Sequence, residues 1–514
     1  MLTDYLSYAE AQTQVSSNAL WELFDGNRER LNIAHECVDR HATTNQPAIL
    51  IAYADGRDER LSFKDLSRLS SQFAHYLKSR GVGPGDRVAV MLEPSPAFYV
   101  GVFGAIKLGA VAVPLFTLFG PDGFRLRVGD CKPRVLLTTS EKSSLAQGFD
   151  LQVVLTDENF FEELSHYPES FVPNTSANDL AVLQYTSGTT RELPEAVHHP
   201  HRAIVTLMLA ALYGTGIRPG DRFFCPSSPA WGHGLWHGTF APLTLGVQTG
   251  AYSGRFSAER LLKALQDFEI TNLSAAATHY RMMRLSGVAD QYHYALEKLS
   301  YTGEPIDSET LAFIDATFKR PVCSMYGTTE IGVILVNYPG APDFKVKPGS
   351  LGKPIPNVRV EVQNADGKPT PPNKKGELKV WREGKWIPTK DLGWIDDDGY
   401  FYHAGRADDV IISAGWTISA VEVEDAILKH PDVREAAVVG VPDPVRGQVI
   451  KAFVVSGRRG GDEFVTEIQD CVRLGLSQHE YPRQIEFVDE LPKSAAGKIN
   501  RKLLRDRIAA ASVQ

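Results

Sequence analysis

Short apolar runs alternate with longer amphipathic segments through the first part of the chain. The runs at 87–92 (RVAVML), 133–139 (PRVLLTT) and 180–185 (LAVLQY) are rich in β-branched and other apolar residues, as buried strands are. Residues 63–81 (FKDLSRLSSQFAHYLKSRG) space their apolar positions as an amphipathic helix does. Because strands that alternate with helices form parallel sheets covered by those helices, this pattern predicts an α/β fold.

The most apolar stretch covers residues 99–120 (YVGVFGAIKLGAVAVPLFTLFG) and has the length of a membrane span. Lys107 and Pro114 interrupt it, and a charge near the middle of a bilayer costs about 3 kcal/mol or more. We therefore predict a helix followed by a buried parallel strand, and no membrane span. The polar, acidic start of the chain (MLTDYLSYAEAQTQ) has no signal pattern, so we predict a soluble, cytoplasmic protein.

The pattern changes beyond about Pro342. Short strands at 358–363 (VRVEVQ) and 376–381 (GELKVW), with a turn signal at 396–401 (DDDGYF), predict a small antiparallel, β-barrel-like subdomain. A second change follows 405–411 (GRADDVI).

The last hundred or so residues have their own alternation of elements. A helical segment at 421–430 precedes strands at 435–441 and 450–456, and the chain ends on a basic segment at 498–507. This order predicts a small α+β domain at the C-terminal end.

Composition and charge narrow the class of protein. The 514 residues are 43% hydrophobic and 23% charged, which excludes a disordered or fibrous protein and, by length, fits about three structural units. The 54 Lys and Arg residues against 62 Asp and Glu give a net charge of -8, which argues against nucleic acid as the main partner. The five cysteines form no CxxC pair, so neither a zinc site nor a disulfide framework is expected, and Cys323 is interpreted as a buried, inert thiol.

A loop rich in Ser, Thr and Gly directly follows the strand at 180–185. It reads YTSGTT at 185–190, and such a loop presents backbone N–H groups and hydroxyls to bound phosphate. It is not the GxxxxGK[ST] loop of common nucleotide hydrolases, and the chain has no GxGxxG. Alone this loop is weak evidence, because turns of the same composition are common.

Further motifs follow this loop in a fixed order along the chain. They are YTGEP at 301–305, SMYGTTE at 324–330, Asp391 in PTKDLGW, GRADD at 405–409 and Lys498 in LPKSAAGKINR at 491–501. This ordered set resembles the adenylate-forming superfamily of acyl-CoA synthetases, carrier-protein adenylation domains and beetle luciferases, over residues 32–505. The segments NIAHECVDRHA (from Asn32) and SAAATHYRMM (from Ser274) are most similar to short- and medium-chain acyl-CoA and benzoate-type synthetases.

The resemblance implies a reaction that uses ATP, Mg²⁺ and CoA. A carboxylic acid is converted to an acyl-adenylate with release of pyrophosphate, and the acyl group then passes to CoA with release of AMP. Such an enzyme must hold the α-phosphorus in line with the carboxylate and neutralise the phosphate charges. The loop would hold the β- and γ-phosphates through Thr186, Ser187, Gly188, Thr189 and Thr190.

By the same resemblance, the second group of motifs binds the rest of the nucleotide. Thr329 would hydrogen-bond the α-phosphate and Glu330 would hold Mg²⁺ as a hard carboxylate ligand. Gly303, Glu304 and Pro305 would line the adenine. Asp391 would bind the ribose hydroxyls, and Arg406 would approach the ribose or phosphate. The remaining members of this set are Ser324, Met325, Tyr326, Gly327 and Thr328, with Tyr326 stacked on the adenine.

The resemblance also divides the chain into an adenylation domain, residues 1–407, and a mobile C-terminal domain, residues 408–514, with Asp408 as the hinge. Lys498 would bridge the carboxylate oxygen and the α-phosphate during adenylation, as a fixed cation where charge develops. After the C-terminal domain swings, Gly415 and Trp416 would line the tunnel for the pantetheine arm.

Each of these residues, taken alone, has a plainer interpretation. Glu330 fits a carboxylate at a helix start, Asp391 fits a turn, and Lys498 fits a solvated charge in a basic segment. The functional interpretation gains from the order of the whole set.

The loop departs from the family pattern after Thr190. It continues as RELPE at 191–195, with Glu195 where the family has a lysine. A carboxylate beside a triphosphate is repulsive unless it points away, so either Arg191 supplies the missing charge or the loop binds phosphate less closely.

The segment AWGHGLWH at 230–237 falls where the family lines its acyl pocket. Trp231 and His233 are the candidate pocket residues, and a tryptophan there would favour a small acyl chain or a flat ring. The alternative is that both tryptophans of this segment belong to the core. His198, His199 and His201 are interpreted as a polar strand-to-helix junction and not as a metal site.

The predicted function is therefore an acyl-CoA synthetase acting on a short- or medium-chain, branched or aromatic acid. Two alternatives stay open: an adenylating ligase that loads a carrier-protein phosphopantetheine, and a silent homologue that binds acid or nucleotide. The oligomeric state and any partner protein are not readable from the chain.

Overall fold

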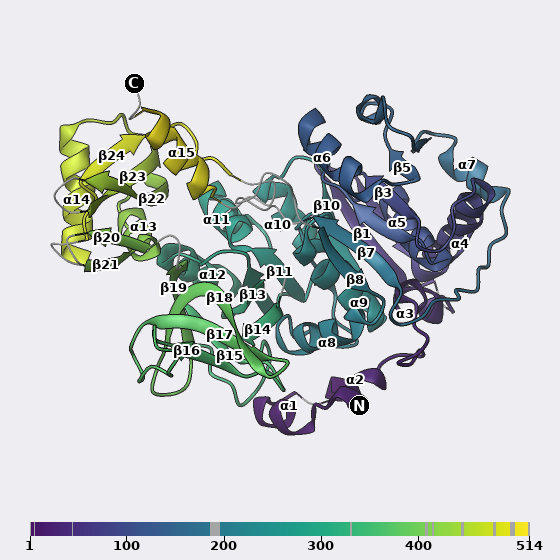
Figure 1. The fold of residues 1–514 in the computed structure, drawn as a ribbon, viewed down its shortest axis with the longest axis horizontal. Coiled ribbons are helices and arrows are strands. Elements are labelled where there is room, and N and C mark those ends of the chain that lie inside the picture. Colours follow the sequence, from purple (N-terminus) through teal and green to yellow (C-terminus); the bar gives the residue numbers. More distant parts are fainter. Residues whose placement is uncertain are drawn as a thin grey trace. The chain divides into compact units, whose positions relative to one another are not determined.

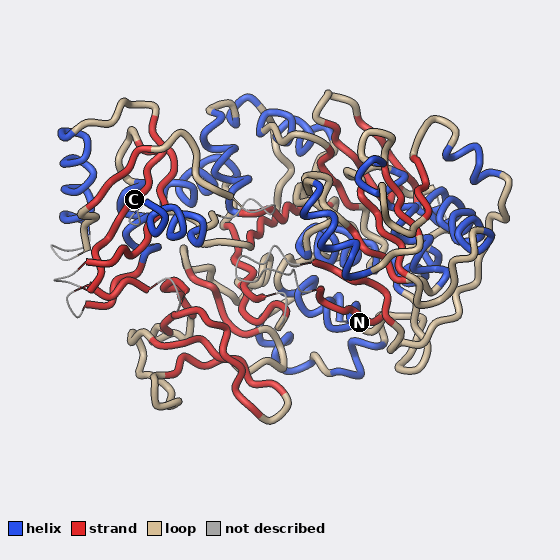
Figure 2. The backbone as a smooth tube through the Cα atoms, turned by 45° about the horizontal axis from the view of Figure 1, so that its top comes forward, coloured by secondary structure: helices blue, strands red, loops and turns tan. Residues whose placement is uncertain are grey.

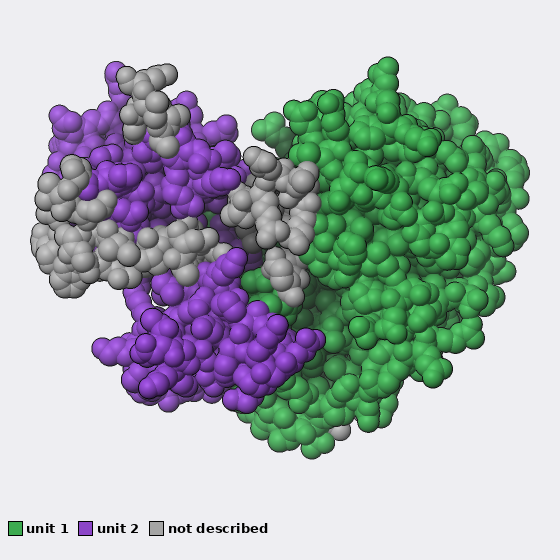
Figure 3. All heavy atoms as spheres, in the orientation of Figure 1, with its two compact units in different colours: residues 1–302, 314–345, 355–357 green, residues 303–313, 346–354, 358–514 purple. Residues whose placement is uncertain are grey.

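The computed structural model describes residues 2–4, 6–43, 45–185, 196–328, 331–406, 410–413, 416–443, 447–475, 480–493 and 499–511. The chain folds into two compact units, which are coloured separately in Figure 3. Unit 1 contains residues 1–302, 314–345 and 355–357, and unit 2 contains residues 303–313, 346–354 and 358–514.

Unit 1 contains a six-stranded sheet in the order β6-β5-β3-β4-β7-β8. Neighbouring strands are parallel except for the pair β7 and β8. The strands are β3 (Arg87–Met91), β4 (Val111–Pro114), β5 (Val135–Thr138), β6 (Gln152–Leu155), β7 (Leu180–Tyr185) and β8 (Ala196–Pro200).

The apolar stretch at 99–120 confirms the predicted order of a helix and a buried strand. Helix α5 (Pro96–Leu108) begins where the Ser95 hydroxyl accepts the Phe98 N–H, and it ends at Gly109, whose φ of 82° suits only a residue without Cβ. Strand β4 then enters the six-stranded sheet beside β3. Helix α5 packs on β3, β4 and α4 (Phe63–Ser79), and its place beside β3 and α4 can be followed in Figure 1.

A second sheet in unit 1 has the strand order β14-β13-β12-β11-β9-β10-β1-β2. Its central strands are parallel, and the antiparallel strands β2 and β14 flank them. The strands are β1 (Pro47–Tyr53), β2 (Asp58–Ser62), β9 (Phe223–Phe224), β10 (Thr249–Ser253), β11 (Asn272–Ala276), β12 (Lys298–Thr302), β13 (Val322–Thr328) and β14 (Gly332–Val336).

Helices precede and connect these strands, and Figure 2 distinguishes helices from strands by colour. Up to β13, the α-helices besides α4 and α5 are α1 (Tyr8–Gln14), α2 (Ser17–Trp21), α3 (Ile33–Cys37), α6 (Pro121–Cys131), α7 (Phe160–Ser165), α8 (Ala203–Tyr213), α9 (Ala241–Thr244), α10 (Ala258–Asp267), α11 (Ala277–Ser286) and α12 (Ser308–Phe318). Short 3-10 turns are η1 (Leu2–Asp4), η2 (Asp39–His41), η3 (Ser143–Ala146) and η5 (Ala289–Gln291), and η4 (His233–Phe240) is a π-helix.

Lys107 is fully buried in unit 1. Its ammonium lies 2.6 Å from the Asp39 carboxylate and donates to the Ser67 carbonyl at 2.8 Å and to the Ser71 hydroxyl at 2.9 Å. The Ser67 hydroxyl donates to the same Asp39 oxygen at 2.6 Å. The charge that argued against a membrane span is thus paired inside the protein, as a buried charge must be.

Unit 2 contains the antiparallel strands expected beyond Pro342, but these strands form an open sheet and not the predicted barrel-like one. The strands lie in the open order β16-β17-β18-β19-β15, and no pairing among the residues the structure describes joins β16 to β15. They are β15 (Ser350–Pro354), β16 (Val360–Gln363), β17 (Gly376–Arg382), β18 (Lys385–Ile395) and β19 (Phe401–Arg406). Alternating apolar positions predict a sheet with one buried face, but they do not determine whether its two edge strands pair to close a barrel.

The C-terminal end has the predicted α+β character. Its strands lie in the order β21-β20-β23-β22, and β24 pairs with β23. The elements are β20 (Val410–Ser413), β21 (Trp416–Ser419), α13 (Ala420–Leu428), β22 (Val433–Asp443), β23 (Gly447–Ser456), α14 (Asp462–Gly475), β24 (Gln484–Phe487) and α15 (Arg501–Ala511). Separate apolar clusters cover the two faces of the sheet formed by β22 and β23.

Asp408, the predicted hinge, lies outside the described residues, so the boundary between 1–407 and 408–514 stays a prediction. Among the helices that the structure describes, none has both the length and the apolar character needed to cross a bilayer.

Candidate active site

Several predicted site residues lie outside the part of the chain that the structure describes. They are Thr186, Ser187, Gly188, Thr189, Thr190, Arg191, Glu195, Thr329, Glu330, Asp408, Gly415 and Lys498. For Arg406 and Trp416 the backbone alone is described. The elements that lead into these residues are described, and they show how the candidate site is held.

The strand that leads into the predicted phosphate loop is anchored by two side chains at its end. The Tyr185 hydroxyl donates to the Asp130 carboxylate at 2.6 Å, and burial raises the pKa of Tyr185 so that it stays protonated. The Gln184 amide donates to the Ala230 carbonyl at 3.3 Å and accepts the Trp236 indole N–H at 3.2 Å. The loop therefore leaves a fixed strand end that is also tied to the candidate acyl pocket.

Strands β12 and β13 carry the next two motifs and are parallel neighbours, with Tyr301 opposite Ser324. Ser324 and Met325 are buried, whereas Tyr326, Gly327 and Thr328 are half-buried. A Cβ at Gly327 would lie 2.0 Å from the Gly332 carbonyl, so this position requires glycine for the close turn into β14. Among residues 324–328, which the structure describes, Tyr326, Gly327 and Thr328 are therefore the ones partly open to a ligand.

Asp391 lies on β18, and its partner in the register with β19 is Arg406. The Asp391 carboxylate is 5% exposed and lies 3.6 Å from Nε2 of His403, also on β19. The His403 Nδ1 accepts the Gly405 N–H at 3.2 Å, which leaves Nε2 to carry a proton toward Asp391. Sequence reasoning did not single out His403.

The predicted acyl segment forms a π-helix, η4, that begins at His233. Helices of this type occur mostly as short segments and are frequent at functional sites. Trp231 is half-buried, whereas Trp236 is buried and bound to Gln184. Trp236 is therefore a core residue, whereas the choice between pocket and core for the half-buried Trp231 stays a prediction.

The signal for this geometry in the sequence is the glycine spacing. A Cβ at Gly234 would lie 2.2 Å from the Ser228 carbonyl, and one at Gly238 would lie 2.9 Å from the Cys225 side chain. Such close approach at two turns of one segment is what only glycine permits.

The three histidines near the loop form the expected junction between β8 and α8. The His201 Nδ1 accepts the Ile33 N–H at 3.1 Å, and the ring of His199 packs against Trp236 at 4.6 Å. Burial lowers the pKa of both imidazoles to about 4, so they are neutral near pH 7. In the described ranges there is no group of three or more His, Cys, Asp or Glu side chains placed to hold a metal.

The five cysteines form no disulfide with one another. All five are free thiols, and burial raises the pKa of Cys323 to about 12. Its thiolate is therefore negligible near neutral pH, as expected for an inert core thiol.

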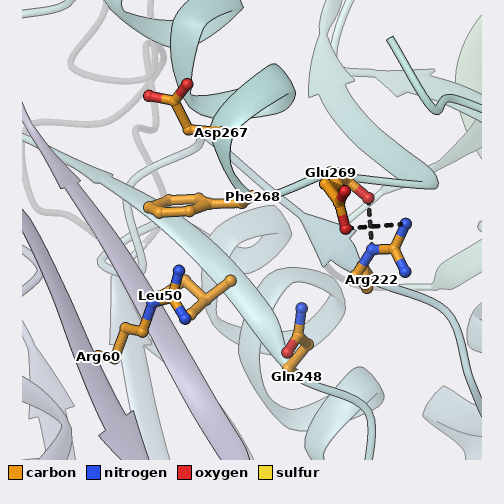
Figure 4. Close-up of a pocket in the computed structure, with 7 residues that line it drawn as sticks. All are labelled: Leu50, Arg60, Arg222, Gln248, Asp267, Phe268 and Glu269. Carbon is orange, nitrogen blue, oxygen red and sulfur yellow. Dashed lines mark hydrogen bonds and ion pairs between the residues drawn. The ribbon is translucent and has the colours of Figure 1, made fainter.

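A surface pocket of about 170 Å³ lies elsewhere in unit 1 and is shown in Figure 4. Arg222 and Gln248 directly precede β9 and β10, so this pocket is at the amino ends of those strands, whereas the motif residues follow carboxyl ends. Ligands of open α/β sheets bind at the carboxyl ends. Arg222 is moreover bound to Glu269, which lines the same pocket, so we do not assign the site there.

Two segments of the chain match known protein families. Residues 38–385 match the AMP-binding enzyme family, and residues 422–498 match the C-terminal domain of AMP-binding enzymes. The chain belongs to the AMP-binding enzyme family. The predicted adenylate-forming enzyme of the acyl-CoA synthetase type is thereby confirmed at the level of the family.

Relatives and solved structures agree over nearly the whole length. The acetyl-coenzyme A synthetase of Bacillus subtilis (strain 168) is 32% identical over 93% of this chain and 90% of that protein. The mitochondrial acyl-coenzyme A synthetase ACSM3 of Rattus norvegicus is 30% identical over 93% and 90%. The crystal structure of the anthranilate CoA ligase AuaEII with anthranoyl-AMP superposes with a TM-score of 0.86, at 26% identity over 97% of this chain and 100% of that one.

These matches confirm the mixed α/β architecture with a small C-terminal domain. The roles of the individual site residues are not tested by them and stay predictions.

Proposed function

We propose that this AMP-binding enzyme is an ATP- and Mg²⁺-dependent acyl-CoA synthetase. It adenylates a short- or medium-chain, branched or aromatic carboxylic acid, releases pyrophosphate, and transfers the acyl group to CoA with release of AMP. The observation that carries this proposal is the full set of motifs, in order, within a chain that matches both parts of the family. Relatives named for acetate and anthranilate support a small acid as substrate.

In this proposal Thr186 to Thr190 bind the β- and γ-phosphates at the end of β7. Two hydrogen bonds, from Tyr185 to Asp130 and from Gln184 to Ala230, anchor the end of β7, where the loop begins. Donors placed at developing charge stabilise it without reorganisation, which is the role proposed for the loop.

The nucleoside and the metal ion use other residues. A buried carboxylate can accept hydrogen bonds from ribose hydroxyls, and Asp391 is such a carboxylate, with the His403 imidazole 3.6 Å away. Mg²⁺ needs only one or two protein carboxylates when phosphates complete its coordination, and Glu330 is the proposed ligand. The bound ion would supply charge neutralisation on the phosphates.

The thiol acceptor would reach the adenylate after movement of residues 408–514 about Asp408, with Gly415 and Trp416 along the pantetheine arm. A carrier-protein thiol has the same arm as CoA, so the acceptor is the first question for experiment. A silent homologue is the second alternative, and its support is Glu195 in the phosphate loop.

The test is pyrophosphate release from ATP and Mg²⁺ over short, medium, branched and aromatic acids, with and without CoA. We expect acid-dependent release that turns over many times only with CoA. A single stoichiometric burst that CoA does not change would favour a carrier-protein ligase. Silence with the whole acid panel would favour the homologue without turnover.

Trp231→Gly is expected to shift the acid preference toward longer or bulkier acids by tenfold or more in kcat/KM. Removing an indole opens space for several methylene groups, and one methylene in an apolar pocket already changes selectivity about 10- to 200-fold. The measurement is kcat/KM across a series of acids of increasing length. Trp236→Phe is the matched control, since Trp236 is buried, and an unchanged preference in Trp231→Gly would place Trp231 in the core instead.

A further inference from the structure

The imidazole of His233 is held at both nitrogens by serine hydroxyls. Its Nδ1 lies 2.9 Å from the Ser227 Oγ and its Nε2 lies 2.9 Å from the Ser274 Oγ. Ser274 belongs to β11, and Ser227 follows β9, the parallel neighbour of β11. The ring is thus held between β11 and the segment that follows β9.

All three side chains are buried: Ser227 is 6%, His233 is 4% and Ser274 is 0% exposed. A neutral imidazole has one donor and one acceptor, and a hydroxyl can serve either, so both hydrogen bonds are satisfied in either tautomer. The Cys225 thiol lies 3.8 Å from Nδ1, and burial raises its pKa to about 12, so it places no charge beside the ring. His233 therefore has both nitrogens engaged by protein and is poorly suited to bind the acid itself.

The ring of His233 instead contacts Trp231. The two rings are 5.3 Å apart at an interplanar angle of 69°, an edge-to-face contact that favours one orientation of the indole. The backbone N–H of Trp231 donates to the Ser228 carbonyl at 3.0 Å, and a Cβ at Gly234 would lie 2.2 Å from the same carbonyl, so the backbone of this turn is closely packed. The half-buried indole of Trp231 thus packs against an imidazole whose own position is fixed by two hydrogen bonds.

We propose that Ser227, His233 and Ser274 are positioning residues that set the orientation of Trp231 and thereby select the acid. His233 acts through Trp231 and not by touching the acid. This inference rests on the proposed function, since it takes Trp231 as a wall of the acyl pocket.

The test compares Ser227→Ala with the matched variant Ser227→Thr, which keeps a hydroxyl. The readout is the ratio of kcat/KM for a long and a short acid. Losing one buried hydrogen bond to the ring should change that ratio about 3- to 10-fold, the equivalent of the usual contribution of such a bond. Ser227→Thr should retain the wild-type ratio, and the KM for ATP should not change in either variant.

His233→Phe removes both hydrogen bonds and should change the ratio in the same direction. Each variant is repeated in a Trp231→Ala background, where the change should disappear because the positioned side chain is gone. A change that persists in that background would overturn the proposal, since His233 would then act on the acid directly. An unaltered ratio in an active Ser227→Ala enzyme would also overturn it.

A second measurement does not depend on turnover. The near-UV circular dichroism spectrum of a protein minus that of its own Trp231→Phe counterpart reports the orientation of the Trp231 indole. This difference spectrum should be altered in the Ser227→Ala background and preserved in the Ser227→Thr background. A difference spectrum in the Ser227→Ala background that equals that of the wild type would refute the positioning role. Failure of the proposed function shows separately, as a wild-type protein without acid-dependent pyrophosphate release.

Discussion

Lys498→Ala is expected to slow acyl-adenylate formation about 100- to 1,000-fold, the usual cost of removing one fixed group that stabilises developing charge. Thioester formation from a supplied acyl-adenylate should change only a few-fold. The reason is that the proposed role of Lys498 is confined to the adenylation step, where charge builds between the carboxylate and the α-phosphate. Lys498 lies at the end of the segment that matches the family's C-terminal domain.

The two half-reactions are measured separately. Pyrophosphate release with acid and ATP reports adenylation, and acyl-CoA formation from a synthetic acyl-adenylate reports the second step. Lys502→Ala is the matched control, because Lys502 is an exposed lysine in α15 of the same C-terminal region. Equal losses in both half-reactions of Lys498→Ala would show that the residue is not specific to adenylation.

Asp39→Ala is expected to reduce the stability of unit 1 by about 3–5 kcal/mol, the usual cost of leaving a buried charge without its partner. Lys107 is 0% exposed and would keep only the neutral acceptors from Ser67 and Ser71. The measurement is the urea unfolding transition of unit 1. The double variant Asp39→Leu with Lys107→Met is the control, because apolar residues of similar volume should recover most of the loss.

The same variant should show a characteristic pH dependence. Burial lowers the pKa of Lys107 below its ordinary value, against the opposing effect of Asp39. Between the pKa of Lys107 in the folded protein and its pKa in the unfolded chain, the unfolded chain binds more protons. The contribution of Lys107 to the free energy of unfolding therefore rises with pH up to about pH 10. Removing Asp39 lowers the folded pKa further, and Asp39→Ala should therefore regain stability relative to the wild type as pH rises. A difference that stays constant with pH would contradict this account of Lys107.

The local sequence pattern predicted individual helices and strands well, but it did not predict whether the strands beyond Pro342 close into a barrel. The stretch at 99–120 forms the expected helix and strand, because a continuous apolar run broken by Gly109 has few other ways to be buried. The antiparallel strands beyond Pro342 were also predicted, but the predicted barrel is an open sheet. Alternation along a strand reports which face is buried, whereas closure depends on register between strands far apart in the chain.

The π-helix at His233–Phe240 was not predicted. Its glycines are visible in the sequence, but the carbonyls of Ser227 and Ser228 that require Gly234 are apparent only once the chain has turned back on itself. The same limit applies to His403, whose relation to Asp391 depends on the pairing of β18 and β19.

The sequence alone determined the family of this protein: the order and residue types of its motifs are those of the AMP-binding family, and they predict an acyl-adenylate. These motifs are short stretches of contiguous residues, so they can be recognised without the tertiary structure. Tertiary structure decided which side chains meet: Ser274 contacts His233 in the candidate acyl pocket, and Asp39 pairs with Lys107 in the interior of unit 1, across 41 and 68 positions of the chain. Hydrogen bonds and ion pairs act over about 3 Å, so partners so far apart in the chain are chosen by the packing of strands and helices and not by local pattern.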